Sequence, residues 1–205
     1  MAAPPLEIEM ANNRNLTQAD ILPWDEFART RVEHRRRIAA SKRNRRVAVG
    51  PYVNFYFENF DTMWLQVQEM LHIERGGAAQ LLGELEAYNP LIPKGRELVA
   101  TFMIEIPDPA RRAQILAGLG GIEETAFLDV DGERIAGQPE LDQDRTNGEG
   151  KASSVQFVHF PFTKAQVEAF RRPRATVSVG LEHPDYRHMA GMPEAVKAEL
   201  AGDFS

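Results

Sequence analysis

The stretch QVQEMLHIER, residues 66–75, places side chains that can bind a metal ion or transfer a proton at the spacing of a helix. Glu69 and His72 stand three residues apart, which is the Glu-x-x-His spacing of the ligands in di-iron carboxylate proteins. Those proteins need two such motifs and two further glutamates on long helices, and this sequence holds the motif once, so the signal is weak. One hypothesis is a carboxylate-rich site for iron, manganese or zinc, in an enzyme or a sensor. Its candidate ligands are Glu58, Glu69, His72 and Glu74.

Glu74 raises a second question, because it falls on the apolar face of the same predicted helix. With Val67 at the centre of that face, Glu74 points in nearly the same direction at about 100° per residue, whereas the Glu-x-x-His pair points to the opposite side. A carboxylate buried in an apolar face costs several kcal/mol unless it is paired or stays protonated. A metal ligand or a general acid–base group is one interpretation, and a structural ion pair is the favoured one. Arg31, Arg45 and Arg46 are available, and we predict a buried ion pair between Glu74 and Arg31.

The basic residues are concentrated in one segment. Residues 29–46 hold nine lysines and arginines and a single acid, so the segment carries about +8, and the rest of the chain carries about −14 because the total is −6. Such a segment can bind a polyanion, but more often it lies against acids of the same protein. Nucleic acid is not the expected ligand, because the chain is acidic overall and lacks the signature of an RNA-recognition domain. The candidate anion-binding residues are Arg31, Arg35, Arg45 and Arg46.

Several classes of function are excluded by what the sequence lacks. It contains no cysteine, which rules out a thiol nucleophile, a disulfide framework and a cysteine-ligated metal centre. It has no P-loop, Gly-x-Gly-x-x-Gly or Gly-x-Ser-x-Gly motif. No apolar run approaches the ~20 residues that span a bilayer, and the N-terminus does not resemble a secretory signal. We therefore expect a cytoplasmic protein that does not enter a membrane.

The elements that must position these residues follow a clear order. The N-terminal part is predicted as a helix, a β-hairpin and two further helices. From Glu97 onward the order is β-α-β-β-α-β, the arrangement of a ferredoxin-like fold with an antiparallel sheet, so the predicted class is α+β. The N-terminal elements cover residues 24–43, 46–59, 62–75 and 78–88. The later ones cover residues 97–106, 108–119, 125–132, 134–137, 153–162, 163–172 and 175–182, followed by a short helix from Pro193.

An internal repeat supports this order. Residues 102–116, FMIEIPDPARRAQIL, align without gaps on residues 156–170, QFVHFPFTKAQVEAF. Glu105 and His159 are equivalent in the repeat, but the central strands of the predicted fold run antiparallel, so each should lie apart with local partners. The segment HPDYRH, residues 183–188, has no specific metal spacing and is predicted as an exposed polar turn.

The chain is expected to form one compact unit with three parts. Residues 1–15 are predicted as a flexible arm, residues 16–96 as a layer of helices and a hairpin, and residues 97–205 as the ferredoxin-like core. The predicted helices of the core cover one face of its sheet. The other face needs the N-terminal layer or a second copy of the chain, as in a homodimer.

Six blocks of sequence point to a known family. They are RRVAVGP, FEN, QVQEML with IE two residues further on, ELEAYNPLIP, ELVATFMIEIPD and VQFVHF, and together they resemble the uncharacterised bacterial family domain of unknown function 3501 (DUF3501). The resemblance covers nearly the whole chain, and it implies a cytoplasmic protein without an established activity. His72 stands where the family is expected to have arginine, which counts against a site that depends on this histidine. The blocks carry Glu58, Asn59, Gln66, Gln68, Glu69, Glu74, Glu84, Tyr88 and Asn89.

Three hypotheses about function follow. Genes of the family often stand beside those of rubrerythrin-type proteins and iron–sulfur oxidoreductases, so the resemblance implies a non-catalytic accessory protein of a redox or peroxide-defence system, with a redox protein as its partner. The second hypothesis is the carboxylate-rich metal site, and the third is an anionic ligand bound by the basic segment.

Overall fold

The computed structural model describes residues 14–140 and 151–205. Almost all of the predicted N-terminal arm lies outside this part, as do most of the residues between the elements predicted at 134–137 and 153–162. None of the described helices is long and apolar enough to cross a membrane. The helices are α1 Trp24–Lys42, α2 Phe60–Glu74, α3 Gly77–Tyr88, α4 Pro109–Ala117, α5 Lys164–Arg171 and α6 Glu194–Leu200. The strands are β1 Arg46–Val49, β2 Val53–Phe57, β3 Glu97–Ile104, β4 Ala126–Val130, β5 Glu133–Ala136, β6 Gln138–Pro139, β7 Val155–Pro161, β8 Val177–His183 and β9 Tyr186–Gly191.

Local sequence signals explain where the helices begin. Asn59 precedes α2 and accepts a hydrogen bond from the backbone N–H of Thr62 at 3.0 Å, while the Thr62 hydroxyl accepts one from the Asn59 N–H at 2.9 Å. Asp108 caps α4 in front of Pro109, and Thr163 caps α5. These side chains satisfy backbone donors that every α-helix leaves free in its first turn.

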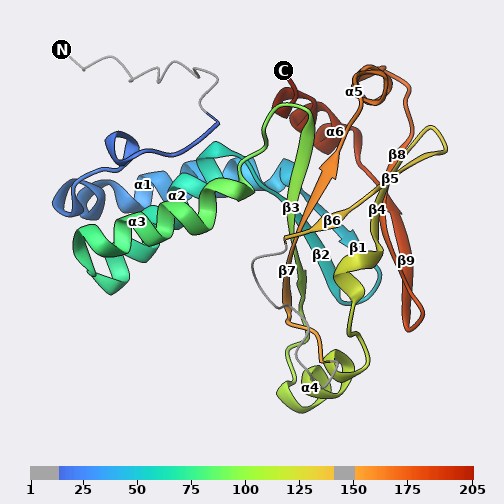
Figure 1. Cartoon of the computed structure of the whole chain (residues 1–205), viewed down its shortest axis with the longest axis horizontal. Helices are drawn as coiled ribbons and strands as arrows, with labels where there is room; N and C mark the ends of the chain where they lie inside the picture. The colour runs from blue at the N-terminus through green and yellow to red at the C-terminus, as the bar shows by residue number, and fades with distance from the viewer. Residues whose placement is uncertain (1–13, 141–150) are drawn as a thin grey trace.

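The strands form two antiparallel sheets (Figure 1). The first sheet has the order β1-β2-β3-β7-β6, and the second has the order β5-β4-β8-β9. The main hydrophobic core draws buried residues from both sheets, among them Phe102, Phe160, Leu128 and Val179. Alternate residues of each strand point to opposite faces, so each strand contributes every second side chain to this core.

The ferredoxin-like topology is not confirmed, because the strands predicted for one sheet are divided between two. β3 and β7 are neighbours and antiparallel as predicted, but β4 and β8 pair with each other in the second sheet. The reason is that both outer edges of the β3–β7 pair are occupied: β2 of the N-terminal hairpin pairs with β3, and β6 pairs with β7. The predicted boundary between residues 96 and 97 therefore runs through a continuous sheet. The coarser prediction, a mixed α and β fold with antiparallel sheets, is confirmed.

The internal repeat corresponds to two consecutive β-α-β-β units. The first is β3-α4-β4-β5, and the second is β7-α5-β8-β9. Phe102 and Gln156, which the repeat aligns, are directly opposite each other in the β3–β7 ladder. Leu128 and Val179 are opposite each other in the β4–β8 ladder. Each ladder therefore pairs two strands that have equivalent places in the two units.

The segment 183–188, predicted as an exposed polar turn, forms the tip of the β8–β9 hairpin: residues 184 and 185 are an exposed turn, but His183 ends β8 and Tyr186 begins β9. Tyr186 is buried, and its hydroxyl joins the second sheet to the first. It accepts hydrogen bonds from the N–H groups of Tyr52 and Val53 at 3.0 and 3.1 Å, and it donates one to the carbonyl of Val49 at 2.8 Å. The strand was missed because its exposed residues are polar.

Helices α1, α2 and α3 lie side by side and run away from the strands of the first sheet (Figure 1). They share a second hydrophobic core, in which Val99 is the one fully buried residue from a strand. The helices thus pack mainly on one another. The other buried members of this core are Leu16, Phe27, Ile38, Met63, Trp64, Val67, Leu91 and Ile92.

Candidate functional site in the helical layer

The candidate metal ligands are not brought together. The Glu69 carboxylate accepts three hydrogen bonds from the Arg31 guanidinium, at 2.7 to 3.1 Å. Glu58 is buried just after β2, and its Oε1 accepts a hydrogen bond from the Thr101 hydroxyl at 2.7 Å. Within the described part of the chain, no group of three or more histidines, aspartates and glutamates could hold a metal ion. The arrangement therefore favours structural roles for these carboxylates.

The predicted ion pair between Glu74 and Arg31 is wrong. Glu74 is exposed at the last position of α2, and its Oε2 accepts a hydrogen bond from Gln80 of α3 at 3.0 Å. The helical angles did separate two sides of α2, since Glu69 and His72 contact α1 while Glu74 contacts α3. The prediction of burial failed because Glu74 is the last residue of α2, a helix that runs away from the strands of the first sheet (Figure 1).

The four arginines predicted to bind an anion each contact an acid of the protein itself. Their charges are therefore at least partly neutralised within the fold, which favours the structural interpretation of the basic segment. The pairs are Arg31–Glu69 at 2.7 Å, Arg35–Glu69 at 3.9 Å, Arg45–Asp203, Arg45–Glu199 at 3.4 Å and Arg46–Glu105 at 3.7 Å.

Glu105 and His159 lie apart with separate partners, as the antiparallel arrangement of the central strands predicted. Glu105 accepts a hydrogen bond from the Tyr56 hydroxyl at 2.9 Å. His159 stands between two carboxylates, with Nδ1 3.1 Å from Glu97 and Nε2 3.1 Å from Glu140. We name this group the His159 cluster.

The His159 cluster shifts the pKa values of two of its members. Burial alone lowers the pKa of His159, but the hydrogen bonds and charges of Glu97 and Glu140 outweigh burial and raise it. Burial alone raises the pKa of Glu97, but the hydrogen bond to His159 and that from the Lys94 backbone N–H outweigh it and lower the pKa. Both shifts favour the charged forms of His159 and Glu97. The cluster therefore adds electrostatic attraction between β3, β7 and Glu140, the residue after β6.

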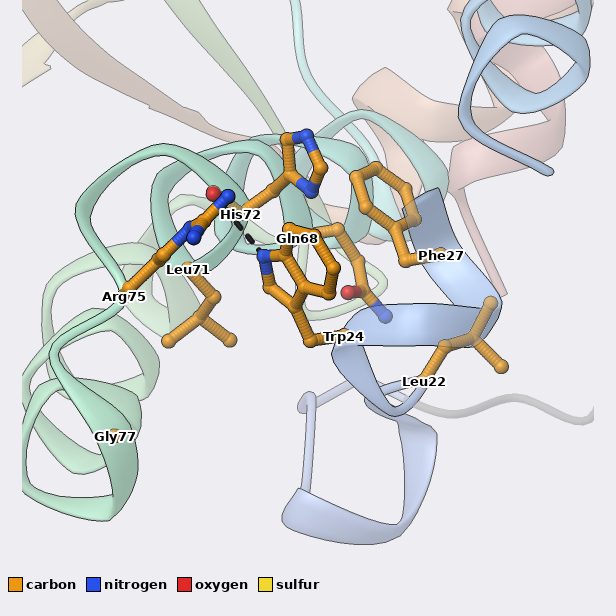
Figure 2. A pocket seen from close by; sticks show the side chains of 8 residues that line it. All are labelled: Leu22, Trp24, Phe27, Gln68, Leu71, His72, Arg75 and Gly77. Atoms are coloured by element: carbon orange, nitrogen blue, oxygen red, sulfur yellow. Dashed lines mark hydrogen bonds between the residues drawn. The ribbon is translucent and has the colours of Figure 1, made fainter. Parts of the chain in front are cut away.

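A pocket of about 300 Å³ lies between the start of α1 and the end of α2 (Figure 2). We name it the α1/α2 pocket. The Trp24 indole stacks on the His72 ring, with centroids 5.1 Å apart and planes inclined by 12°, and Trp24 Nε1 donates to the His72 carbonyl at 3.2 Å. The Arg75 guanidinium carbon lies 4.5 Å from the centroid of the Trp24 ring. The pocket is lined by Leu22, Trp24, Phe27, Gln68, Leu71, His72, Arg75 and Gly77.

Aromatic contacts continue from the pocket into the helical layer. Phe27 meets His72 edge-on at 5.7 Å and Trp64 at 6.1 Å, and His34 meets Trp64 at 4.8 Å between ring centroids. Burial lowers the pKa of His34, and the charge of Arg37 lowers it further, which favours the neutral ring among these aromatic groups. Contacts of this kind contribute about 0.5–1.5 kcal/mol each beyond the apolar area that they bury. They hold α1 against α2 and so fix the walls of the pocket.

Two buried polar atoms beside the pocket lack a hydrogen-bond partner. They are Nε2 of Gln68, a residue that is 2 % exposed, and Nδ1 of His72. The two residues stand one helical turn apart on α2, so both atoms belong to the same region. Because buried polar groups in folded proteins are almost always hydrogen-bonded, two unpartnered atoms one helical turn apart single out this region of α2.

Helix α3 packs Leu81, Leu85 and Tyr88 against the second core and exposes Leu82 together with small residues. None of its residues is buried, and Leu82 is 66 % exposed. Gln80 and Glu84 are half-buried and joined by a hydrogen bond of 3.1 Å. The exposed surface, named the α3 face, consists of Ala78, Ala79, Leu82, Gly83, Glu86 and Ala87.

Sequence reasoning selected His72 as a site residue but missed the rest of the α1/α2 pocket. Trp24 begins the helix predicted at residues 24–43, and Gln68 belongs to a family block. Neither signal indicated a pocket, because Trp24 and His72 are 48 residues apart and meet only through the packing of α1 on α2.

The fold and the helical layer define an α+β protein with two antiparallel sheets, and comparisons with known proteins give its family. The chain belongs to the family described as protein of unknown function (DUF3501), whose match covers residues 15–204 and confirms the resemblance. A crystal structure of a protein of unknown function from Burkholderia pseudomallei K96243 is similar, with 34% sequence identity and a TM-score of 0.86. The likeness covers 93% of this chain and 100% of that one. No curated protein matches the chain significantly.

Proposed function

We propose that this protein is a non-catalytic accessory protein of a cytoplasmic redox or peroxide-defence system, and that it docks on a redox protein through the α3 face. The composition of that face carries the proposal. Its one charged residue is Glu86, and Leu82 stands exposed among alanine and glycine. A surface helix ordinarily turns charged and polar residues outward, and an exposed apolar patch is typical of an interaction site.

The small residues of the α3 face suit one kind of contact. Two packed helices lie 8–10 Å apart depending on the side chains between them, and alanine and glycine permit the closest approach. We therefore expect the partner to present a helix to Ala79, Leu82 and Gly83. The family resemblance supplies the class of partner, a rubrerythrin-type protein or an iron–sulfur oxidoreductase.

The alternatives receive less support from the described residues. A metal site built from the predicted ligands would need Glu58 and Glu69 to converge, yet they bond to Thr101 and Arg31 respectively. An anion site in the basic segment would need free arginines, yet all four candidates contact acids. An interaction protein needs neither arrangement.

Affinity purification of the full chain from its own cells, with mass-spectrometric identification, tests the proposal. A redox protein should be recovered with the wild type and lost with Leu82→Glu, which places a charge in the α3 face. Val32→Glu is the matched control, because Val32 is 81 % exposed on α1 and should tolerate the same change. Recovery that is equal for both variants, or no redox protein in any preparation, would contradict the proposal.

A further inference from the structure

The α1/α2 pocket has the composition of a small-molecule site. Leu22, Phe27 and Leu71 supply apolar walls, and Trp24 supplies an aromatic surface that is 42 % exposed and thus open to a ligand. Ligand pockets in proteins are typically apolar with a few polar groups at defined positions. A volume of about 300 Å³ equals that of about ten water molecules, so the pocket has room for a ligand with a single ring.

The polar groups of the pocket define one end of the ligand. Figure 2 shows the Gln68 amide reaching from α2 toward α1. Its Nε2 is a buried donor without a partner, and a donor of this kind requires an acceptor atom. His72 Nδ1 is also unpartnered one turn further along α2. The inner end of the ligand should therefore carry a hydrogen-bonding atom, such as a ring nitrogen or a phenolic oxygen.

Arg75 defines the outer end of the ligand. It follows the last residue of α2 with a φ of 56°, a left-handed conformation that ordinarily favours glycine, and this conformation ends the helix beside the pocket. The guanidinium lies over Trp24, and within the described residues no carboxylate forms an ion pair with it. An arginine at the exposed rim of an apolar pocket suits a planar carboxylate, to which it can donate two parallel hydrogen bonds.

From these groups we infer that the α1/α2 pocket binds a small aromatic carboxylate that carries a second hydrogen-bonding atom on its ring. The ring lies against Trp24 and the apolar walls, the ring heteroatom accepts from Gln68, and the carboxylate meets Arg75. This site is separate from the α3 face, so the inference does not rest on the proposed docking function.

Calorimetric titration of the full-length protein with three related compounds tests the roles of the carboxylate and of the ring heteroatom separately. Nicotinate has both the carboxylate and the ring nitrogen, benzoate lacks the ring nitrogen, and nicotinamide lacks the charge. Nicotinate should bind at least tenfold more tightly than either of the others. No heat of binding for nicotinate at millimolar concentration, or equal binding of all three, overturns the inference.

Variants of the protein give the complementary test. Gln68→Leu should weaken nicotinate binding at least tenfold and leave benzoate binding unchanged, while its melting temperature stays the same or rises, because an unpartnered buried amide is replaced by an apolar group of similar size. Arg75→Gln should weaken both acids at least tenfold, and the exposed Arg29→Gln on α1 should weaken neither. If Gln68→Leu lowers the melting temperature and leaves nicotinate binding unchanged, the amide serves the fold and the inference fails.

Discussion

Arg45 and Asp203, which are 158 residues apart in the sequence, form an ion pair that joins the residues after α1 to the C-terminus. Arg45 is 2 % exposed and also donates to the carbonyl oxygens of Phe57 at 3.0 Å and Glu58 at 3.1 Å. A guanidinium engaged in this way is part of the fold. Arg45, which was predicted to bind an external anion, therefore stabilises the packing of the C-terminal residues on the rest of the fold.

Replacing Arg45 should destabilise the protein strongly. Arg45→Met leaves the carboxylate of Asp203 and two backbone carbonyls without their donor, and breaking a buried ion pair typically costs about 3–5 kcal/mol. Urea unfolding followed by circular dichroism measures this loss. Arg43→Met, at an exposed position two residues earlier, should change the free energy of unfolding by no more than about 0.5 kcal/mol. An Arg45→Met protein as stable as the wild type would rule out this structural role.

A pair of double-mutant cycles should separate the two glutamates of α2. Arg31 and Glu69 share three hydrogen bonds, so removing both side chains should cost less than the sum of the two single changes. Arg31 and Glu74 have no shared contact, and their effects should add. The measurement is the free energy of unfolding of the single and double alanine variants. A coupling free energy between Arg31 and Glu74, with none between Arg31 and Glu69, would instead support the predicted ion pair between Arg31 and Glu74.

The His159 cluster should make stability depend on pH in two directions. The pKa of His159 is raised in the folded protein, so its contribution is complete below its ordinary value of 6.5 and is lost as pH rises through the raised pKa. The pKa of Glu97 is lowered, so its contribution is complete above its ordinary value of 4.5 and is lost as pH falls through the lowered pKa. The cluster therefore stabilises the protein most between these two ordinary values.

Unfolding of His159→Gln in urea across a pH series tests this dependence. The variant should lose about 1–3 kcal/mol near pH 6, because hydrogen bonds between charged groups are removed, and its stability should fall less steeply than that of the wild type above pH 6.5. His188→Gln, at an exposed position of β9, should keep the wild-type slope. A His159→Gln slope identical to that of the wild type would show that the cluster does not titrate with folding.

Most strands were predictable from the sequence, but β9 and the arrangement of the strands in sheets were not. The sequence located β3 and β7, and the structure shows that Phe102 and Gln156, which the repeat aligns, lie opposite each other. Which strand edges remain free depends on contacts between distant segments. β2 occupies the outer edge of β3, so β4 and β8 form a second sheet, and no local pattern in the sequence records this competition.

The site was predictable only in part, for a related reason. Helical angles distinguished the sides of α2 that carry Glu69 and Glu74, because those angles depend on spacing alone. Burial of Glu74 depended on how α2 lies relative to the strands, which spacing does not encode. The α1/α2 pocket is lined by residues of α1 and α2, among them Trp24, Gln68 and Arg75. The missing hydrogen-bond partner of the Gln68 amide can be recognised only when the packing of the two helices is known.

Photocrosslinking in cells tests the docking of the α3 face most directly. A photoreactive residue in place of Leu82 should form a crosslink to a redox protein after irradiation, and the same residue in place of Val32 should not, because Val32 lies on α1 outside the α3 face. Mass spectrometry of the crosslinked product identifies the partner. Crosslinks from position 82 only to a second copy of the chain, or no more crosslinking than from position 32, would contradict the proposed function.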